Sequence, residues 1–157
     1  MITIIDYGMG NTGSLVNMLK KIGFPSIVTS DVNIIKNAFK VILPGVGAFD
    51  TAINKIDNID GLRETLKNLA NVKKIHILGI CLGMQLLTKN SEEGILPGLD
   101  LIDAKTIKLP QVKNIKVPHM GWNKAMPINK NSLLKNFKSE LKFYFVHSYY
   151  VSFKNKK

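Results

Sequence analysis

Short apolar runs and segments of helical periodicity alternate through the first half of the chain. Four runs rich in β-branched residues, each bounded by turn-forming residues, predict buried strands at 2–5, 26–29, 40–43 and 75–80. Between these runs apolar residues recur at three- and four-residue spacing, which predicts helices at 12–22, at 32–39 and around Leu62, Leu66 and Leu69. Strands that alternate with helices indicate an α/β protein with a doubly wound, mainly parallel sheet.

The pattern changes in the second half of the chain. Strands are predicted at 99–107 and 113–117, and we expect them to form an antiparallel extension of the sheet. A turn-rich segment at 118–123 and a short helix at 132–137 follow, and the aromatic run 142–146 predicts one more strand. Neither a repeat nor an interdomain linker interrupts the sequence, so a single domain over residues 1–157 is predicted.

Glycine-rich or polar loops follow three of the predicted parallel strands. They are the segments 6–11 and 44–50 and the turn at Cys81. In doubly wound sheets the functional crevice lies outside the carboxyl ends of the strands. We therefore expect one crevice to collect all three loops.

Cys81 is the only cysteine, and it lies between a predicted strand and a predicted helix. Gly79 and Gly83 stand two residues before and two residues after it, which is the thiol version of the nucleophile elbow. In so tight a turn, larger side chains at these two positions would collide with neighbouring backbone. A lone cysteine is more often a small buried apolar residue. The two glycines at these offsets favour a nucleophile instead, with its thiolate stabilised by the N–H groups of the first helical turn.

Two neighbours of this turn fit the same chemistry. The loop 44–47 could direct a backbone N–H at a developing oxyanion together with the N–H of Leu82, although a plain tight turn explains its glycines equally well. Gln85 lies one helical turn after Cys81 and could hold a polar substrate in the crevice. An ordinary solvent-facing glutamine is the alternative interpretation.

A thiolate that attacks an amide also needs an acid, usually histidine, to protonate the leaving amine. His76 lies inside a predicted strand, where a structural role is favoured. His119 and His147 could approach the site, and the sequence leaves open whether either one does. The acidic group that would orient such a histidine is equally open among the glutamates, which are Glu64, Glu92, Glu93 and Glu140.

Charge and composition exclude several other classes. The formal net charge is +11, but the lysines are scattered and Arg63 is the single arginine, so a solvated basic surface is favoured over a nucleic-acid partner. No apolar run approaches the roughly 20 residues of a membrane-spanning helix, and the first residues do not resemble a secretion leader. One cysteine cannot form an internal disulfide, so we expect a cytoplasmic protein. The absence of a Cys/His cluster with zinc spacing predicts no metal and no cofactor.

Six motifs in fixed order closely resemble the glutamine amidotransferase subunit of imidazole glycerol phosphate synthase, a class I, triad-type amidotransferase. The resemblance covers residues 1 to about 151, and its motifs are Asp6-Tyr7-Gly8-x-Gly10-Asn11, Leu43-Pro44-Gly45-Val46-Gly47-Ala48-Phe49, Gly79-Ile80-Cys81-Leu82-Gly83-Met84-Gln85, Ser91-Glu92-Glu93, Val117-Pro118-His119-Met120-Gly121-Trp122-Asn123 and Phe143-Tyr144-Phe145-Val146-His147-Ser148-Tyr149. The cysteine motif marks the wider class, and the last two motifs are specific to this subunit.

The resemblance implies a glutaminase in which Cys81 attacks the side-chain amide of glutamine and forms a glutamyl thioester that water hydrolyses. By the same resemblance, the oxyanion hole consists of Gly45, Val46, Gly47 and Leu82, after a peptide flip signalled by a partner. The implied glutamine-binding residues are Gln85, His147, Ser148 and Tyr149.

The implied partner is a (β/α)8-barrel cyclase, with which this chain would form a heterodimer in histidine biosynthesis. Ammonia would pass to the cyclase and complete imidazole glycerol phosphate, with release of an aminoimidazole carboxamide ribotide. The implied interface residues are Asp6, Tyr7, Gly8, Asn11, Met120, Trp122 and Asn123.

One departure from the family pattern concerns the catalytic triad. Family members carry a His-Pro-Glu-like segment that completes it, and these 157 residues contain none. We therefore expect a fold that is incomplete at the C-terminus and a chain with little or no glutaminase activity. Two alternatives stay open: a non-catalytic, truncated module that docks on a cyclase-like barrel, and a paralogue that delivers ammonia to another acceptor, as in surface-sugar amidation.

Overall fold

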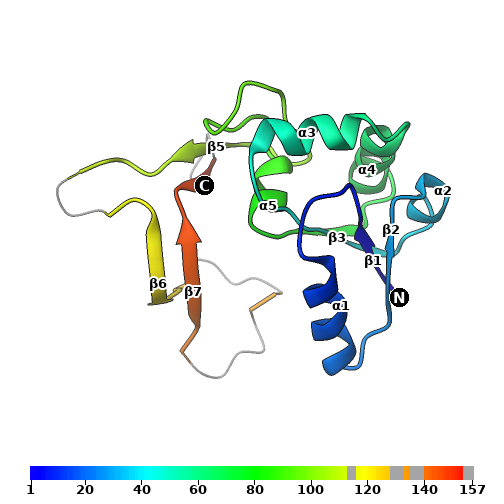
Figure 1. The fold of residues 1–157 in the computed structure, drawn as a ribbon, viewed down its shortest axis with the longest axis horizontal. Helices are drawn as coiled ribbons and strands as arrows, with labels where there is room; N and C mark the ends of the chain where they lie inside the picture. The colour runs from blue at the N-terminus through cyan, green and yellow to red at the C-terminus, as the bar shows by residue number, and fades with distance from the viewer. Residues whose placement is uncertain (113–115, 128–132, 135–139, 154–157) are drawn as a thin grey trace. The chain divides into compact units, whose positions relative to one another are not determined.

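The computed structural model describes residues 1–112, 116–127, 133–134 and 140–153 (Figure 1). The chain divides into two compact units, one of Met1–Lys108 with Tyr149–Lys157 and one of Leu109–Ser148. The prediction of a single domain stays a prediction. No helix within the described ranges is long and apolar enough to cross a membrane.

The first unit is built on a four-stranded sheet with the strand order β2-β1-β3-β4. Its strands are β1 (Ile2–Ile5), β2 (Ser26–Thr29), β3 (Lys40–Leu43) and β4 (His76–Gly79). All three pairings are parallel. The parallel sheet predicted from the alternating pattern is therefore confirmed, with each strand end within about one residue of its predicted position.

Helices connect these strands. They are α1 (Thr12–Lys21), α2 (Val32–Ile35), α3 (Phe49–Asp57), α4 (Leu62–Asn71) and α5 (Leu82–Leu86). The side chain of Asn11 caps α1 by accepting a hydrogen bond from the Ser14 N–H. The prediction of a helix over 32–39 was too long, because the N–H groups of Asn37 and Ala38 bond three residues back instead of four and close the helix as a turn.

Strand alternation divides the core between the two faces of the sheet. Ile5 and Leu43 point to the side that is covered by α3, α4 and α5, and they join the larger core cluster there. Ile4 and Ile42 point to the opposite side and pack against Leu19 of α1. Figure 1 shows the same division, with α1 on one side of the sheet and α3, α4 and α5 on the other. Successive residues of a strand face opposite sides, so a sheet covered on both faces reads as an uninterrupted apolar run.

An antiparallel pair completes the first unit. β5 (Ala104–Lys108) pairs with β8 (Tyr149–Phe153), two segments that are far apart in the sequence. The pair is a sheet of its own, separate from the four parallel strands. The predicted strand 99–107 begins only at Ala104, because the N–H groups of Leu99 and Leu101 bond to the last carbonyls of the α5 segment and hold this stretch against the helix end.

The second unit is centred on the hairpin of β6 (His119–Lys124) and β7 (Lys142–His147), which pair antiparallel with His119 opposite His147. β7 confirms the strand predicted at 142–146. The turn-rich interpretation of 118–123 was wrong, since this segment pairs with β7 along its whole length from His119 onward. Of the strand predicted at 113–117, residues 113–115 lie outside the described ranges and residues 116–117 form no strand. The predicted helix at 132–137 lies outside the described residues except for 133–134, which form a turn.

Candidate active site

Cys81 occupies the sharp bend between β4 and α5. Its backbone dihedrals are φ 55° and ψ −116°, a left-handed conformation that side-chain-bearing residues rarely adopt. The residue is exposed. Strain of this kind costs on the order of 1–3 kcal/mol and persists only where the surroundings hold it. The bend therefore presents a thiol at the carboxyl end of the sheet and at the start of a helix.

Gly79 and Gly83, on either side of the bend, have no room for a side chain. A Cβ on Gly79 would lie 2.6 Å from the carbonyl oxygen of Gly83 and 2.6 Å from the Cα of Met84. A Cβ on Gly83 would collide with the carbonyl oxygen of Leu43 and lie 2.8 Å from its carbon. Both obstacles are backbone, which cannot rotate away. The elbow geometry predicted from the glycine spacing is confirmed.

The loop 44–47 packs directly on this elbow. A Cβ on Gly45 would lie 2.7 Å from the Gly83 nitrogen and 2.9 Å from the Cβ of Leu82. The Ile80 N–H also donates a 3.0 Å hydrogen bond to the carbonyl of Leu43, so the ends of β3 and β4 stay paired up to the bend. Among the described residues, the Leu82 N–H has no hydrogen-bond acceptor. An N–H left free at this position is available to an anionic oxygen.

The loop after β1 lies against the same segment from the other side. A Cβ on Gly10 would lie 2.8 Å from the Cβ of Pro44, and a Cβ on Gly47 would lie 2.9 Å from the Cε of Met9. The hydroxyl of Tyr7 donates a 2.6 Å hydrogen bond to the carbonyl of Pro44. The three loops that follow β1, β3 and β4 therefore meet at one edge of the sheet, as the strand order predicts.

Gln85 belongs to a short polar chain that leads away from the elbow. The Ser91 hydroxyl donates a 2.8 Å hydrogen bond to Oε1 of Gln85 and accepts one of 3.1 Å from the Glu93 N–H. Ser91 is buried. The Oε2 atom of Glu93 is also buried, and it is the one side-chain polar atom of the described residues that is buried without a hydrogen-bond partner. A buried carboxylate oxygen left unpaired carries a large desolvation cost, which a bound cation would remove.

The sequence left open which of its four glutamates orients a catalytic histidine, and Glu93 is one of the four. The signal that separates it from the others is its place in Ser91-Glu92-Glu93, where the neighbouring Glu92 is already engaged: its Oε2 accepts a 2.7 Å hydrogen bond from the Lys108 N–H. The sequence motif alone does not show that Ser91 bonds Gln85. That contact, which places Glu93 close to α5, becomes visible only in the folded structure.

The three histidines belong to β4 and to the second unit. His76 is exposed at the amino end of β4, five residues before Cys81, or about 16 Å along an extended chain. His119 and His147 belong to the second unit and form a pair, with 3.0 Å between Nδ1 of His119 and Nε2 of His147. His147 and Ser148 lie in the second unit and Tyr149 begins β8 of the first, so the glutamine-binding role predicted for these three residues stays a prediction.

The predicted interface residues differ in exposure. Asp6, Gly8 and Asn11 are exposed, whereas Tyr7 is 4% exposed and bonds inward to Pro44. In the hairpin, Met120 and Trp122 are 61% and 74% exposed, and Asn123 is exposed with its side-chain amide 3.2 Å from Nε2 of His119. The interface role of all seven residues stays a prediction.

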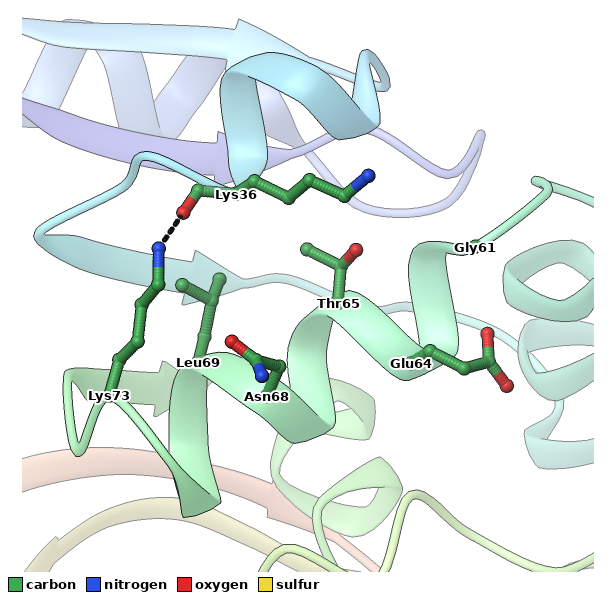
Figure 2. A pocket seen from close by; sticks show the side chains of 7 residues that line it. All are labelled: Lys36, Gly61, Glu64, Thr65, Asn68, Leu69 and Lys73. Carbon is green, nitrogen blue, oxygen red and sulfur yellow. Dashed lines mark hydrogen bonds between the residues drawn. The ribbon is translucent and has the colours of Figure 1, made fainter.

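A surface hollow of about 480 Å³ lies between α2 and α4, and of the candidate site residues it contains only Glu64. Its lining residues are Lys36, Gly61, Glu64, Thr65, Asn68, Leu69 and Lys73, as Figure 2 shows. One of its two ammonium groups is already engaged, because Lys73 donates a 2.5 Å hydrogen bond to the carbonyl of Lys36 (Figure 2). Glu64 points away from that pair (Figure 2). The hollow shares no lining residue with the elbow.

Within the described ranges, no group of three or more His, Cys, Asp and Glu side chains is placed to hold a metal ion. The chemistry available at the elbow is therefore that of a strained, exposed thiol, a free backbone N–H beside it and a buried carboxylate nearby.

Comparison with known proteins defines the class. The family model "Glutamine amidotransferase class-I" matches residues 3–157. The fold is similar to a crystal structure of a Thermoplasma acidophilum protein assigned to GMP synthase, with a TM-score of 0.65 and 18% sequence identity. That match covers 96% of this chain, which spans 65% of the other chain's length. A class-I glutamine amidotransferase is thus the class of protein that the fold and the family match define.

The curated relatives narrow this class. The imidazole glycerol phosphate synthase subunit HisH 2 of Methanococcus maripaludis is 51% identical over 157 residues, which are 100% of this chain and 77% of the relative. Subunit HisH of Methanothermobacter thermautotrophicus is 48% identical, over 96% of this chain and 73% of the relative. Subunit HisH of Bdellovibrio bacteriovorus is 40% identical, over 99% and 77%. The chain belongs to the family of imidazole glycerol phosphate synthase subunit HisH, within the class-I glutamine amidotransferases.

Proposed function

We propose that this chain is the glutaminase subunit of an imidazole glycerol phosphate synthase and works in histidine biosynthesis. The observation that carries the proposal is the exposed thiol of Cys81, held in a strained bend against the loop 44–47. The family match over residues 3–157 supports it. The substrate is glutamine, and the products are glutamate and ammonia.

In the proposed reaction the Cys81 thiolate attacks the carboxamide carbon of glutamine, and the carbonyl oxygen becomes an oxyanion. The Leu82 N–H, which has no acceptor among the described residues, and an N–H of Gly45, Val46 or Gly47 stabilise that charge. The carbon–nitrogen bond then breaks, and the amine leaves as ammonia after gaining a proton. Water hydrolyses the resulting thioester to glutamate and returns the thiol.

We propose that Glu93 binds the α-ammonium group of the same glutamine. Its buried Oε2 atom has no partner among the described residues, and a cation is the ligand that compensates a desolvated carboxylate. Two hydrogen bonds, from the Glu93 backbone N–H to Ser91 and from Ser91 to Gln85, link the Glu93 backbone to α5. The substrate would then be held at both ends, with its amide at Cys81 and its amino group at Glu93.

The proposed partner is a (β/α)8-barrel cyclase subunit, with which the chain forms a heterodimer that completes the lyase reaction. One face of the β6–β7 hairpin supports this proposal, because Met120 lies opposite Val146 and Trp122 opposite Tyr144 in its register. All four side chains are at least 55% exposed. An exposed apolar and aromatic patch of this kind is typical of a protein interface.

We propose further that these 157 residues by themselves release little or no ammonia. The leaving amine needs an acid, His-Pro-Glu does not occur in the sequence, and His76 lies at the far end of β4 from Cys81. A non-catalytic docking module is the second candidate function, and the missing His-Pro-Glu is the observation that favours it. A paralogue that serves surface-sugar amidation would keep the Cys81 site and change only the acceptor of ammonia.

A reducing compartment suits this chemistry, since Cys81 must stay a free thiol to act as a nucleophile. We therefore propose that the protein works in the cytoplasm.

The decisive experiment supplies glutamine to the purified chain with its cyclase and measures glutamate release, with Cys81→Ala as the control. We expect little or no turnover, but selective labelling of Cys81 by the chloroketone analogue of L-glutamine. Near-normal turnover would refute the proposed loss of activity. Failure of the analogue to label Cys81, while iodoacetamide does, would refute the glutamine site itself, and identification of the co-purified partner would separate the histidine pathway from another acceptor.

A further inference from the structure

We propose that Asp50 is a positioning residue for glutamine, which holds the loop that carries Glu93 in place relative to the oxyanion loop 44–47. The inference rests on the proposed function above. Asp50 itself touches no reacting atom, and it acts through the backbone of the loop 91–96.

The carboxylate of Asp50 binds two successive backbone N–H groups of a segment more than forty residues away. Its Oδ1 atom accepts hydrogen bonds of 3.0 Å from Ile95 and 3.0 Å from Leu96, and its Oδ2 atom accepts one of 3.1 Å from Ile95. Asp50 is the second residue of α3, where an acidic side chain interacts favourably with the positive end of the helix dipole. An ionised carboxylate that receives two backbone N–H groups is a strong, directional anchor.

The Asp50 carboxylate packs closely against the backbone of Gly94. A Cβ at Gly94 would collide with Oδ1 of Asp50 and would lie 2.7 Å from its Cγ and 2.9 Å from Cδ1 of Phe49. The Gly94 N–H also donates a 3.2 Å hydrogen bond to the carbonyl of Ser91. The turn that contains Glu93 therefore lies between two fixed points, which are the Ser91–Gln85 hydrogen bond on one side and Asp50 on the other.

The other end of this link is the oxyanion loop. α3 begins at Phe49, immediately after Gly47 and Ala48, so Asp50 stands three residues from the end of the loop that packs on the elbow. The amide and the ammonium group of glutamine are a fixed number of bonds apart. A site that holds both must keep the oxyanion loop and Glu93 at a matching separation, and small misplacements of such groups are costly. The Asp50 side chain joins the start of α3, which directly follows the oxyanion loop, to the loop that carries Glu93.

The test compares three electrophiles on the full chain: the chloroketone analogue of L-glutamine, the same chloroketone without its α-amino group, and iodoacetamide. In each reaction the Cys81 thiolate displaces the halide, so no acid is needed. For Asp50→Asn we expect the second-order rate constant of labelling by the glutamine analogue to fall about 10-fold. The fall should come from a higher half-saturation concentration, because a group that binds the analogue is displaced. The rates with the analogue that lacks the amino group and with iodoacetamide should stay within about two-fold of wild type, because neither probe uses Glu93.

Asp60→Asn is the matched control, an exposed carboxylate in the turn between α3 and α4, and it should leave all three rates unchanged. Gly94→Ala is a second, independent variant, since its methyl group displaces the Asp50 carboxylate. It should show the same selective loss, and the double variant Asp50→Asn/Gly94→Ala should be no slower than either single one.

Three results would overturn the role of Asp50: no change with the glutamine analogue, an equal fall with all three electrophiles, or a folded fraction too small to label. Selective labelling of the wild-type chain together with any of these results leaves the proposed function standing. A wild-type chain whose Cys81 reacts with iodoacetamide but shows no preference for the glutamine analogue would overturn the proposed function, and the inference with it.

Discussion

The hydroxyl of Tyr7 donates a buried hydrogen bond of 2.6 Å to the carbonyl oxygen of Pro44, 37 residues further along the chain. It joins the loop after β1 to the first residue of the loop that packs on the Cys81 elbow. Burial raises the pKa of the Tyr7 hydroxyl well above its usual range, because the charged phenolate would be desolvated there. The protonated form, which is the one that can donate, is thus maintained at all ordinary pH values.

Removal of this donor should destabilise the chain. Tyr7→Phe keeps the ring but leaves the Pro44 carbonyl without its partner, which costs about 1–3 kcal/mol. The free energy of unfolding in urea measures the loss. Tyr144→Phe, at a hydroxyl-bearing ring that is 55% exposed, is the control and should change stability by no more than about 0.5 kcal/mol. An equal effect of the two substitutions would mean that the Pro44 bond contributes nothing.

The same hydroxyl predicts a pH dependence. Its folded-state pKa is raised above the unfolded value of 10.0, so the unfolded chain loses this proton first as pH rises. The stabilising contribution is therefore complete below the unfolded pKa and falls as pH rises above it. Thermal unfolding from pH 8 to pH 11 should show a steeper fall of Tm above about pH 10 in the wild type than in Tyr7→Phe. Parallel curves for the two proteins would contradict the assignment to Tyr7.

Gly83→Ala should be severely destabilising. The added methyl group would collide with the Leu43 carbonyl, and backbone at the end of β3 cannot move without disturbing the sheet. We expect a loss of about 3 kcal/mol or more, measured as the free energy of unfolding. Gly13→Ala in α1 is the matched control, because the nearest atom to its Cβ would be 3.9 Å away. That substitution should be neutral or stabilise the chain by up to about 1 kcal/mol.

The strain at Cys81 can be measured by comparing two substitutions that both remove the thiol. Cys81→Gly adopts a φ of 55° without steric cost, whereas Cys81→Ala keeps the penalty. The glycine variant should therefore be the more stable of the two by about 1 kcal/mol in chemical denaturation. Both should lose all labelling by the chloroketone analogue. A less stable glycine variant would show that the bend is not strained.

The exposed face of the hairpin predicts where the partner binds. Trp122→Ala should weaken binding to the cyclase at least about 10-fold, because a large aromatic side chain in an interface is a common hot spot. Its Tm should stay unchanged, since Trp122 is 74% exposed in the free chain. Phe39→Ala is the matched control, an aromatic residue that is 81% exposed in the first unit. Calorimetric titration of cyclase into each variant measures both affinities, and equal affinities for the two variants would exclude this face.

The parallel strands and the elbow could be predicted because each depends on residues close together in the sequence. The runs at 2–5 and 40–43 are mostly buried and the run at 26–29 is half-buried, whereas exposed and half-buried residues alternate along β4. Gly79 and Gly83 meet backbone only a few residues away or on the adjacent strand. The sequence pattern did not predict β6, because its residues are typical of turns. The segment is extended because it pairs with β7. Its strand character comes from its neighbour.

By itself, the sequence determined the alternation of strands and helices, the parallel sheet and the place of the single thiol at a strained bend. These follow from side-chain periodicity and local steric limits, which act over a few residues. Only the tertiary structure decided that Tyr7 bonds Pro44, that Ser91 reaches Gln85, that Glu93 keeps an unpaired buried oxygen and that Asp50 anchors Ile95 and Leu96. Each of these contacts joins loops from different strands, and no local pattern encodes the distance between them, because that distance is set by how the strands order themselves in the sheet.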